Sequence, residues 1–243
     1  NLFDCTLETR EVWSINKREI FVQQVGNMRP GCSILIHCAT GGIGLAALNV
    51  CLHYKCDIYA TVGSEKKRAY LNKHYPQIPN NHIGNSRDTS FEQMIKRETE
   101  SRGVDFVLNS LSEDKLQASI KCLARKGQLM ELGKYDLAND SYLNLLLMEK
   151  EAIYHGIVLD ALLRNSVKET KSKLTECLLE GIKAGFVKPL PRVCFNATQV
   201  EESYKYMMSG QHIGRILVKL RNEEDIDHDD NGIEKFQISS KPR

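Results

Sequence analysis

Short apolar runs alternate along the chain with longer segments in which apolar residues recur at helical spacing. The first run begins at Ser33 and stops at a group of small residues, and a helical pattern follows it directly. The later runs that predict strands are residues 57–62, 82–84, 105–109, 128–132, 152–158 and 214–220. The segments that predict helices are residues 44–54, 65–74, 90–102, a helix from Ser112, and residues 142–150, 166–184 and 198–208. This alternation is typical of α/β proteins, in which helices cover both faces of a parallel sheet.

Two of these helices begin with a capping-box pattern. Ser90 precedes Gln93 by three residues, and Thr198 precedes Glu201 by three. In such a box the first hydroxyl and the third side chain each take up a free N–H group at the helix start. We therefore expect helices to begin at these two positions.

The first apolar run ends in a turn rich in small residues. The turn comprises Ala39, Thr40, Gly41, Gly42, Ile43 and Gly44. A dinucleotide pyrophosphate requires this order of strand, glycine turn and helix. The glycines let the backbone approach the phosphates, and N–H groups at the helix start face them. Ala39 stands where the strictest fingerprint has its first glycine. The turn predicts a dinucleotide site; the alternative is an ordinary strand-to-helix turn that binds nothing.

The second predicted strand ends where NAD-binding proteins carry an acidic residue for the ribose. Ser64 occupies that position here, and Lys67 and Arg68 follow within one turn. A carboxylate would repel a 2′-phosphate, whereas a hydroxyl and two cations can bind it through charge-assisted hydrogen bonds. We therefore expect NADPH rather than NADH; Glu65 counts against this expectation unless its side chain points away. The alternative is a solvated, lysine-rich first turn of a surface helix.

Two further strand ends carry polar residues. Asn109 and Ser110 end the run at 105–109, and we expect them to border the nicotinamide ribose because that strand end faces the cofactor. His37, at the end of the first run, is expected to be packed rather than to act as a general acid.

Composition narrows the class of protein. The chain has 243 residues, 42% of them apolar, and a net charge of +2, which suggests neither a nucleic-acid nor an anionic membrane partner. No apolar run approaches the roughly 20 residues of a bilayer span, and the first residues lack the pattern of a secretory signal. The eight cysteines form no CxxC pair. This spacing predicts neither a zinc cluster nor a disulfide framework, and reduced thiols in the cytoplasm are expected.

Several stretches together resemble a known family. They are residues 37–44, 61–71, 85–92, 103–111, 115–119, 155–161 and 211–214. They resemble the enoyl reductase region of animal type I fatty acid synthase, over about residues 27 to 220. That family belongs to the zinc-free branch of the medium-chain dehydrogenase/reductase superfamily. The resemblance implies a Rossmann-type, doubly wound parallel sheet with helices on both faces, plus part of a returning C-terminal segment of the substrate domain.

The resemblance also implies an activity. Such a reductase uses NADPH to saturate a trans-2-enoyl chain held on an acyl carrier protein, adding hydride to the β-carbon and a proton to the α-carbon. The family's candidate proton donors fall on Lys134 and Asp160. The implied partners are the acyl carrier protein, neighbouring synthase domains and a second copy of the chain, paired through an edge strand near residues 153–158.

The resemblance leads to an expected domain organisation. We expect an unassigned lead-in at residues 1–26, a dinucleotide-binding domain at 27–185, a return segment at 186–220 and an acidic flexible linker at 221–243. The substrate domain of the family has no counterpart, so we expect a piece of a multifunctional synthase, or a truncated relative, whose turnover alone is open. The alternatives are a quinone-type oxidoreductase of the same superfamily and a non-catalytic NADPH-binding module.

Overall fold

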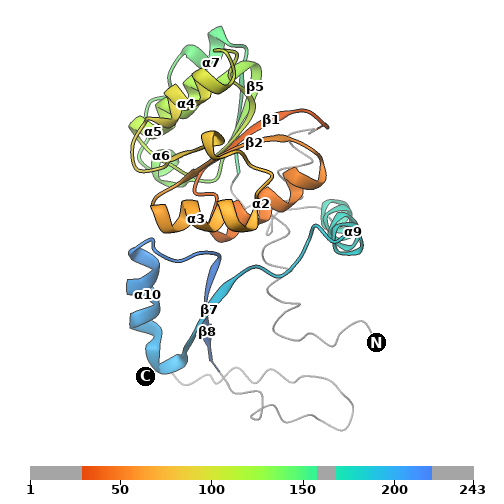
Figure 1. Cartoon of the computed structure of the whole chain (residues 1–243), viewed down its shortest axis with the longest axis vertical. Coiled ribbons are helices and arrows are strands. Elements are labelled where there is room, and N and C mark those ends of the chain that lie inside the picture. Colours follow the sequence, from red (N-terminus) through yellow and green to blue (C-terminus); the bar gives the residue numbers. More distant parts are fainter. Residues whose placement is uncertain (1–28, 158–167, 221–243) are drawn as a thin grey trace. The chain divides into compact units, whose positions relative to one another are not determined.

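The computed structural model describes residues 29–157 and 168–220, and the chain divides into two compact units (Figure 1). The first unit runs to Pro191 and also takes in Ile213–Arg215; the second comprises Arg192–His212 and the chain from Ile216. The predictions for the lead-in at 1–26, for the linker at 221–243 and for Asp160 lie outside the described residues.

The first unit is built on a six-stranded sheet in which all neighbouring strands run parallel. In spatial order the strands are β3 (Ile83–Asn85), β2 (Asp57–Val62), β1 (Ser33–Ile36), β4 (Val104–Asn109), β5 (Leu123–Glu131) and β6 (Ile153–Gly156). Ile34 of β1 pairs with Ile58 on one side and with Phe106 on the other. The strand order reverses between β1 and β4, and in open parallel sheets ligands bind at the carboxyl ends of the strands at such a point.

Helices cover both faces of this sheet (Figure 1), which confirms the predicted α/β fold. The helices are α2 (Gly42–His53) and α3 (Glu65–His74) on one face, and α4 (Phe91–Glu98) and α5 (Asp114–Lys121) on the other. The buried apolar side chains form two clusters, one on each face of the sheet. Residues of β1 belong alternately to one cluster and the other, because successive side chains of a strand point to opposite faces. Ile34 and Ile36 pack with α2 and α3, whereas Leu35 packs with α4 and α5.

The predicted helix at residues 90–102 is shorter than expected, and its capping box is absent. Asp88 accepts hydrogen bonds from the Ser90 N–H at 2.9 Å and from the Ser90 hydroxyl, so that hydroxyl caps nothing. The helix ends at Glu98 because the chain turns left-handed just beyond it, with φ of 50° at Glu100 and 65° at Ser101.

The stretch predicted as one helix at 142–150 forms only the short α7 (Leu146–Glu149), after a separate short helix, α6 (Tyr135–Ala138). The side chain of Asn144 accepts the Leu146 N–H at 3.0 Å, so helical structure starts there. Of α7 only Leu147 is buried, so little apolar packing is available to extend it.

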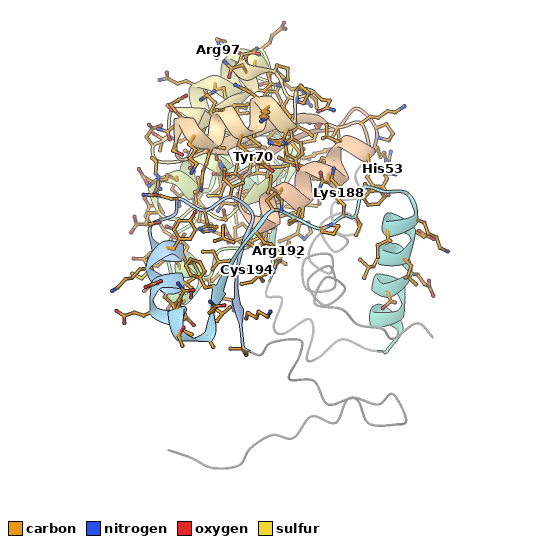
Figure 2. The ribbon with its side chains drawn as sticks, turned by 60° about the horizontal axis from the view of Figure 1, so that its bottom comes forward. His53, Tyr70, Arg97, Lys188, Arg192 and Cys194 are labelled. Carbon is orange, nitrogen blue, oxygen red and sulfur yellow. The ribbon has the colours of Figure 1, made fainter. Side chains whose placement is uncertain are left out.

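A longer helix, α9 (Lys168–Lys183), matches the prediction for 166–184. The segment that follows it is tied to α2, because the ring of Phe186 stacks on His53 with 4.2 Å between centroids (Figure 2 labels His53). This contact fixes the start of the stretch that leads to Pro191.

The second unit is small. It contains β7 (Arg192–Asn196), which pairs with β8 (Arg215–Lys219), and the helix α10 (Val200–Met208). The capping box before α10 is formed by Asn196 and Gln199, not by Thr198 as predicted. This box begins a short 3-10 helix, Ala197–Gln199. The Asn196 N–H donates to the Gln199 side chain at 3.1 Å, so Thr198 lies inside the turn rather than at its start.

Candidate functional site

A cavity of about 180 Å³ lies at the carboxyl ends of β1 and β4. Its lining residues are His37, Cys38, Gly41, Gly42, Ile43, Gly44, Leu108, Ser110 and Leu132. The glycine turn predicted from the sequence therefore forms one wall of a cavity at the point where the strand order reverses.

The glycine turn is held in place by backbone contacts. The Ala39 N–H donates to the Thr61 carbonyl at 2.9 Å, and the Gly214 N–H donates to the Thr40 carbonyl at 2.8 Å. A side chain at Gly44 would not fit, because its Cβ would lie 2.6 Å from the Ala39 Cα. Glycine at this position lets α2 approach β1 closely.

The start of α2 is suited to an anion. Gly41 is its N-cap and provides no side-chain cap, and the first turn contains no acidic residue. The first N–H groups of a helix have no partner within it, and the helix dipole places partial positive charge there. An uncapped helix start beside a cavity can bind a phosphate group without displacing a protein ligand.

A buried polar network underlies the cavity. His37 Nδ1 lies 3.0 Å from the Thr61 hydroxyl, and its Nε2 lies 2.9 Å from the Ser119 hydroxyl. Complete burial lowers the pKa of His37 to about 3, so the ring is neutral near pH 7. This arrangement confirms the prediction that His37 is a packed residue.

The two residues predicted to border the ribose are placed differently. Ser110 is exposed and lines the cavity. Asn109 is fully buried, and its Nδ2 donates to the Leu111 carbonyl at 2.7 Å and to Glu131 Oε2 at 2.6 Å. The side chain of Asn109 is therefore committed to the protein, and only Ser110 presents its side chain to the cavity.

Glu131 was not singled out from the sequence, yet it is the buried carboxyl group of this network. Besides the contact with Asn109, its Oε1 accepts the Gly133 N–H at 2.6 Å. Burial raises the pKa of Glu131, against the opposing effect of the hydrogen bond from Asn109. Glu131 thereby connects the end of β4 to the loop that carries Lys134.

Lys134 is exposed and lies at the N-cap position of α6, directly after this loop. The neighbouring Tyr135 is 55% exposed, whereas Asp136 is buried and accepts the Glu113 N–H at 3.2 Å. Lys134 thus follows the carboxyl end of β5, at the same edge of the sheet as the cavity. Its expected partner Asp160 lies outside the described residues.

The predicted phosphate-binding cluster is only partly brought together. Ser64 is the N-cap of α3, and its hydroxyl accepts the Lys67 N–H at 3.4 Å. Lys67 is half-buried; burial lowers the pKa of its ammonium group, and the nearby Cys38, which directly precedes the glycine turn, opposes this effect. Lys67 therefore lies on the side of α3 that faces the glycine turn.

Arg68 makes different contacts. Its guanidinium donates to the Asn80 backbone carbonyl at 3.3 Å and to the Asn80 side chain at 3.4 Å, and it lies 3.6 Å from the Glu65 carboxylate. Asn80 begins the short 3-10 helix η1 (Asn80–His82), which precedes β3. The structure therefore does not bring the side chain of Arg68 together with Lys67 and the glycine turn.

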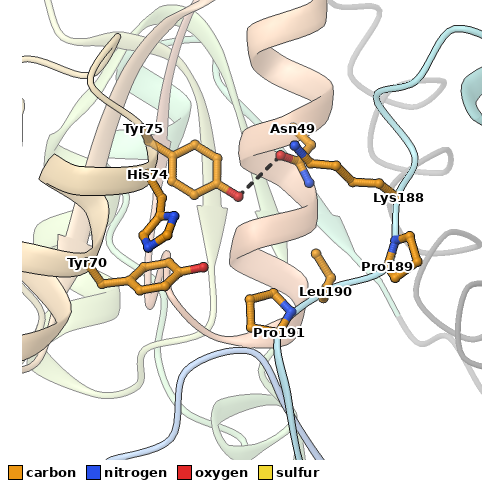
Figure 3. A pocket seen from close by; sticks show the side chains of 8 residues that line it. All are labelled: Asn49, Tyr70, His74, Tyr75, Lys188, Pro189, Leu190 and Pro191. Carbon is orange, nitrogen blue, oxygen red and sulfur yellow. Dashed lines mark hydrogen bonds between the residues drawn. The ribbon is translucent and has the colours of Figure 1, made fainter.

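A second cavity, of about 200 Å³, lies away from these residues (Figure 3). It lies between α2, α3 and the segment 188–191, where the Tyr75 hydroxyl donates to Asn49 at 3.2 Å and the Tyr70 ring stacks on His74. None of the predicted site residues lines it.

The part of the chain that follows the glycine turn matches a known protein family. Residues 80–218, more than half of the chain, match the family described as zinc-binding dehydrogenase. The chain belongs to this family. In the described parts of the chain no three His, Cys, Asp or Glu side chains are grouped so as to hold a metal ion, so these residues do not fit zinc. No described helix is both long and apolar enough to span a bilayer.

The chain is also similar to parts of much larger enzymes. It is 41% identical over 197 residues to highly reducing polyketide synthase sphB of Aspergillus fumigatus, a match that covers 81% of this chain and 8% of the synthase. The chain thus spans less than a tenth of the length of such relatives.

Two solved structures of reductase domains are similar as well. The CurK enoyl reductase superposes with a TM-score of 0.70 at 29% identity, covering 82% of this chain and 57% of CurK. The nucleotide-binding subdomain of the enoylreductase domain of PpsC from Mycobacterium tuberculosis superposes with a TM-score of 0.63 at 32% identity, covering 74% of this chain and 94% of that subdomain. These matches confirm the resemblance to enoyl reductase regions of the medium-chain superfamily, whereas an origin in animal fatty acid synthase is not specifically shown.

Proposed function

We propose that the chain is the nucleotide-binding part of an enoyl reductase, which uses NADPH to saturate trans-2-enoyl chains carried by an acyl carrier protein within a multidomain synthase. The observation that carries this proposal is the uncapped start of α2 at Gly42, which opens onto the cavity at the strand ends. A site of this kind binds a dinucleotide pyrophosphate. Similarity to reductase domains supports the same assignment.

The residues of the site take separate roles in this proposal. The backbone of residues 39–44 binds the pyrophosphate, and Ser110 at the lip of the cavity borders the nicotinamide ribose. Ser64 and Lys67 hold the 2′-phosphate, since a hydroxyl and an ammonium group are donors suited to it. When bound, NADPH supplies the hydride for the β-carbon. Arg68, which bonds to Asn80, stabilises the packing of α3 on η1.

Lys134 is the proposed proton donor to the α-carbon. It follows β5 at the carboxyl edge of the sheet, where open parallel sheets place their ligands. Its ammonium group can deliver a proton as the thioester enolate forms, and the exposed position leaves room for an acyl chain to approach. We propose Asp160 as the residue that orients this lysine.

The kind of synthase is inferred from the relatives. Several fungal highly reducing polyketide synthases are 36–42% identical to this chain, which favours a polyketide synthase over a fatty acid synthase. Both present the substrate as a thioester on a carrier protein, so the proposed reaction is the same. The neighbouring synthase domains and the cytoplasmic location of such an enzyme are part of the proposal.

A homodimer is proposed through β6. This strand is the last in the sheet order and pairs only with β5, so one of its edges carries no strand of the described sheet. Ile153 at its start is 49% exposed. An exposed edge of this kind is a template for pairing with another chain. Light scattering of the purified chain should show two copies, and Ile153→Lys should yield a monomer; a wild-type monomer would contradict this proposal.

The test of the proposed reaction is the reduction of a crotonyl thioester by the complete synthase, measured as the loss of NADPH absorbance. We expect turnover with NADPH on the thioester and none on a simple quinone, because the site is assigned to a carrier-bound enoyl group. Reduction of the quinone alone would instead favour a quinone-type oxidoreductase. NADPH binding without turnover of either substrate would favour a non-catalytic module.

A further inference from the structure

Arg87 follows β3 at the carboxyl edge of the sheet. The Ser86 N–H donates to the Val62 carbonyl at 3.0 Å, which continues the pairing of β3 with β2 up to this point. The Arg87 N–H in turn donates to the Asn85 side chain at 3.0 Å. The backbone of Arg87 is therefore anchored beside the end of β2, next to the residues that lead into α3.

The guanidinium of Arg87 lies directly against Gly63. A Cβ atom at Gly63 would be 2.8 Å from the Arg87 Nε and 3.4 Å from its Nη2. Any other residue at position 63 would push the arginine aside. The absence of a side chain at Gly63 thus allows the guanidinium to lie over the junction between β2 and Ser64, where a ribose is expected.

Two cations meet at this junction. The pKa of Lys67 is lowered by burial and also by the positive charge of Arg87. Like charges raise each other's energy unless an anion lies between them. Within residues 29–157 and 168–220 no ion pair joins Arg87 to a carboxylate, because the adjacent Asp88 is engaged by Ser90 and Asn85. The Arg87 guanidinium is therefore placed to receive an anion from outside the protein.

The other candidate cation lies at the opposite end of β3. Arg68 is bonded to Asn80, which precedes this strand, whereas Arg87 follows it. The position of Arg87 beside β2 depends on strand order, which explains why a residue twenty-three positions after Ser64 can complete the site.

We propose that Arg87, acting with Lys67, selects the 2′-phosphate of NADPH over the 2′-hydroxyl of NADH. This inference rests on the proposed function. The planar guanidinium would donate two hydrogen bonds to one phosphate group, a geometry that lysine cannot reproduce. Gly63 contributes by leaving the space that the guanidinium fills.

The test compares binding of NADPH, NADH and 2′,5′-ADP to the 243-residue chain by fluorescence titration and calorimetry. In Arg87→Ala we expect NADPH and 2′,5′-ADP to bind about 10- to 100-fold more weakly, as for the loss of charge-assisted hydrogen bonds, and NADH to bind as before. Arg87→Lys should recover only part of the affinity. Arg97→Ala, which removes an exposed arginine on α4, is the matched control (Figure 2).

Each outcome separates the two proposals. If the wild-type chain prefers NADPH but Arg87→Ala keeps that preference, or if Arg68→Ala abolishes it instead, the role of Arg87 is overturned and the proposed function stands. If the wild-type chain binds neither NADPH nor 2′,5′-ADP, both are overturned. A loss of NADH binding in Arg87→Ala equal to that of NADPH would show that Arg87 supports the site as a whole and would also overturn its role in selection.

Discussion

Asn109 donates from its Nδ2 to Glu131 Oε2 at 2.6 Å, and this buried contact joins the ends of two neighbouring strands. The two residues are register partners in the pairing of β4 with β5. The second oxygen of the carboxyl group accepts the Gly133 N–H. The buried Glu131 side chain therefore links the end of β4 to the loop before Lys134.

This contact predicts the effect of Glu131→Gln. The amide would present N–H groups to one of two donors, and would leave either one N–H of the Asn109 side chain or the Gly133 N–H without its acceptor. We expect a loss of about 1–3 kcal/mol in the free energy of unfolding, measured by urea denaturation. Glu149→Gln, at an exposed carboxylate, is the control and should change stability little. Equal stability of both variants would show that the Glu131 contacts contribute nothing.

The buried His37 predicts how stability depends on pH. The unfolded chain binds a proton at this ring near pH 6.5, whereas the folded chain does so only near pH 3. Acidification within this window therefore favours the unfolded state, and His37 should contribute a loss of about 2 kcal/mol between pH 7 and pH 5. In His37→Gln the loss over this range should be smaller by that amount, measured by urea denaturation at both pH values. His74→Gln, at an exposed ring, should keep the wild-type dependence; the same slope in His37→Gln would contradict the assignment.

Gly44→Ala tests the close approach of α2 to β1. The added methyl group would meet backbone atoms of Ala39 and Cys38 at about 2.6 Å, and backbone cannot move aside as a flexible side chain can. We expect a loss of about 1–3 kcal/mol in stability and weaker binding of NADPH. Gly156→Ala is a matched control, because nothing lies within 4 Å of its Cβ position. If thermal melts of the two variants coincide, the tight packing at Gly44 is not real.

Lys134→Ala tests the proton donor. In the complete synthase we expect kcat for crotonyl thioester reduction to fall by about 100-fold, the lower range for loss of a general acid, with the Kd for NADPH unchanged. Tyr135→Phe removes the hydroxyl of the neighbouring residue. Tyr135 is 55% exposed, and we expect this variant to keep kcat near the wild-type value. A large loss in Tyr135→Phe and none in Lys134→Ala would move the role to the tyrosine.

The fold follows from the sequence where local pattern and burial agree. The predicted runs at 57–62 and 65–74 coincide with β2 and α3, because an apolar run buried on both faces and a charged helix after a serine N-cap are both local signals. The capping boxes at Ser90 and Thr198 were wrong because neighbouring side chains competed. Asp88 takes up the Ser90 hydroxyl, and Asn196 forms the box that Thr198 was expected to form.

The proposed site could be inferred from the sequence only where its residues are close together along the chain. The turn at residues 39–44 and the position of Ser64 after the second strand can be recognised from local spacing. Arg87 and Glu131 cannot, because their positions depend on β3 lying beside β2 and on the register of β4 with β5. Asn109 was read as a cofactor neighbour because the sequence shows its position at a strand end but not that its side chain turns inward to Glu131.

The central claim is that the glycine turn and Lys67 together bind the phosphorylated end of NADPH. The most direct measurement is the ratio of the Kd values for NADH and NADPH, in the wild-type chain and in Lys67→Ala. We predict a ratio of at least about 100 in the wild type, because Lys67 and Arg87 each make a charge-assisted phosphate contact, and a ratio about 10-fold lower in the variant, which keeps Arg87. Equal wild-type affinities for the two cofactors, or an unchanged ratio in Lys67→Ala, would contradict the claim.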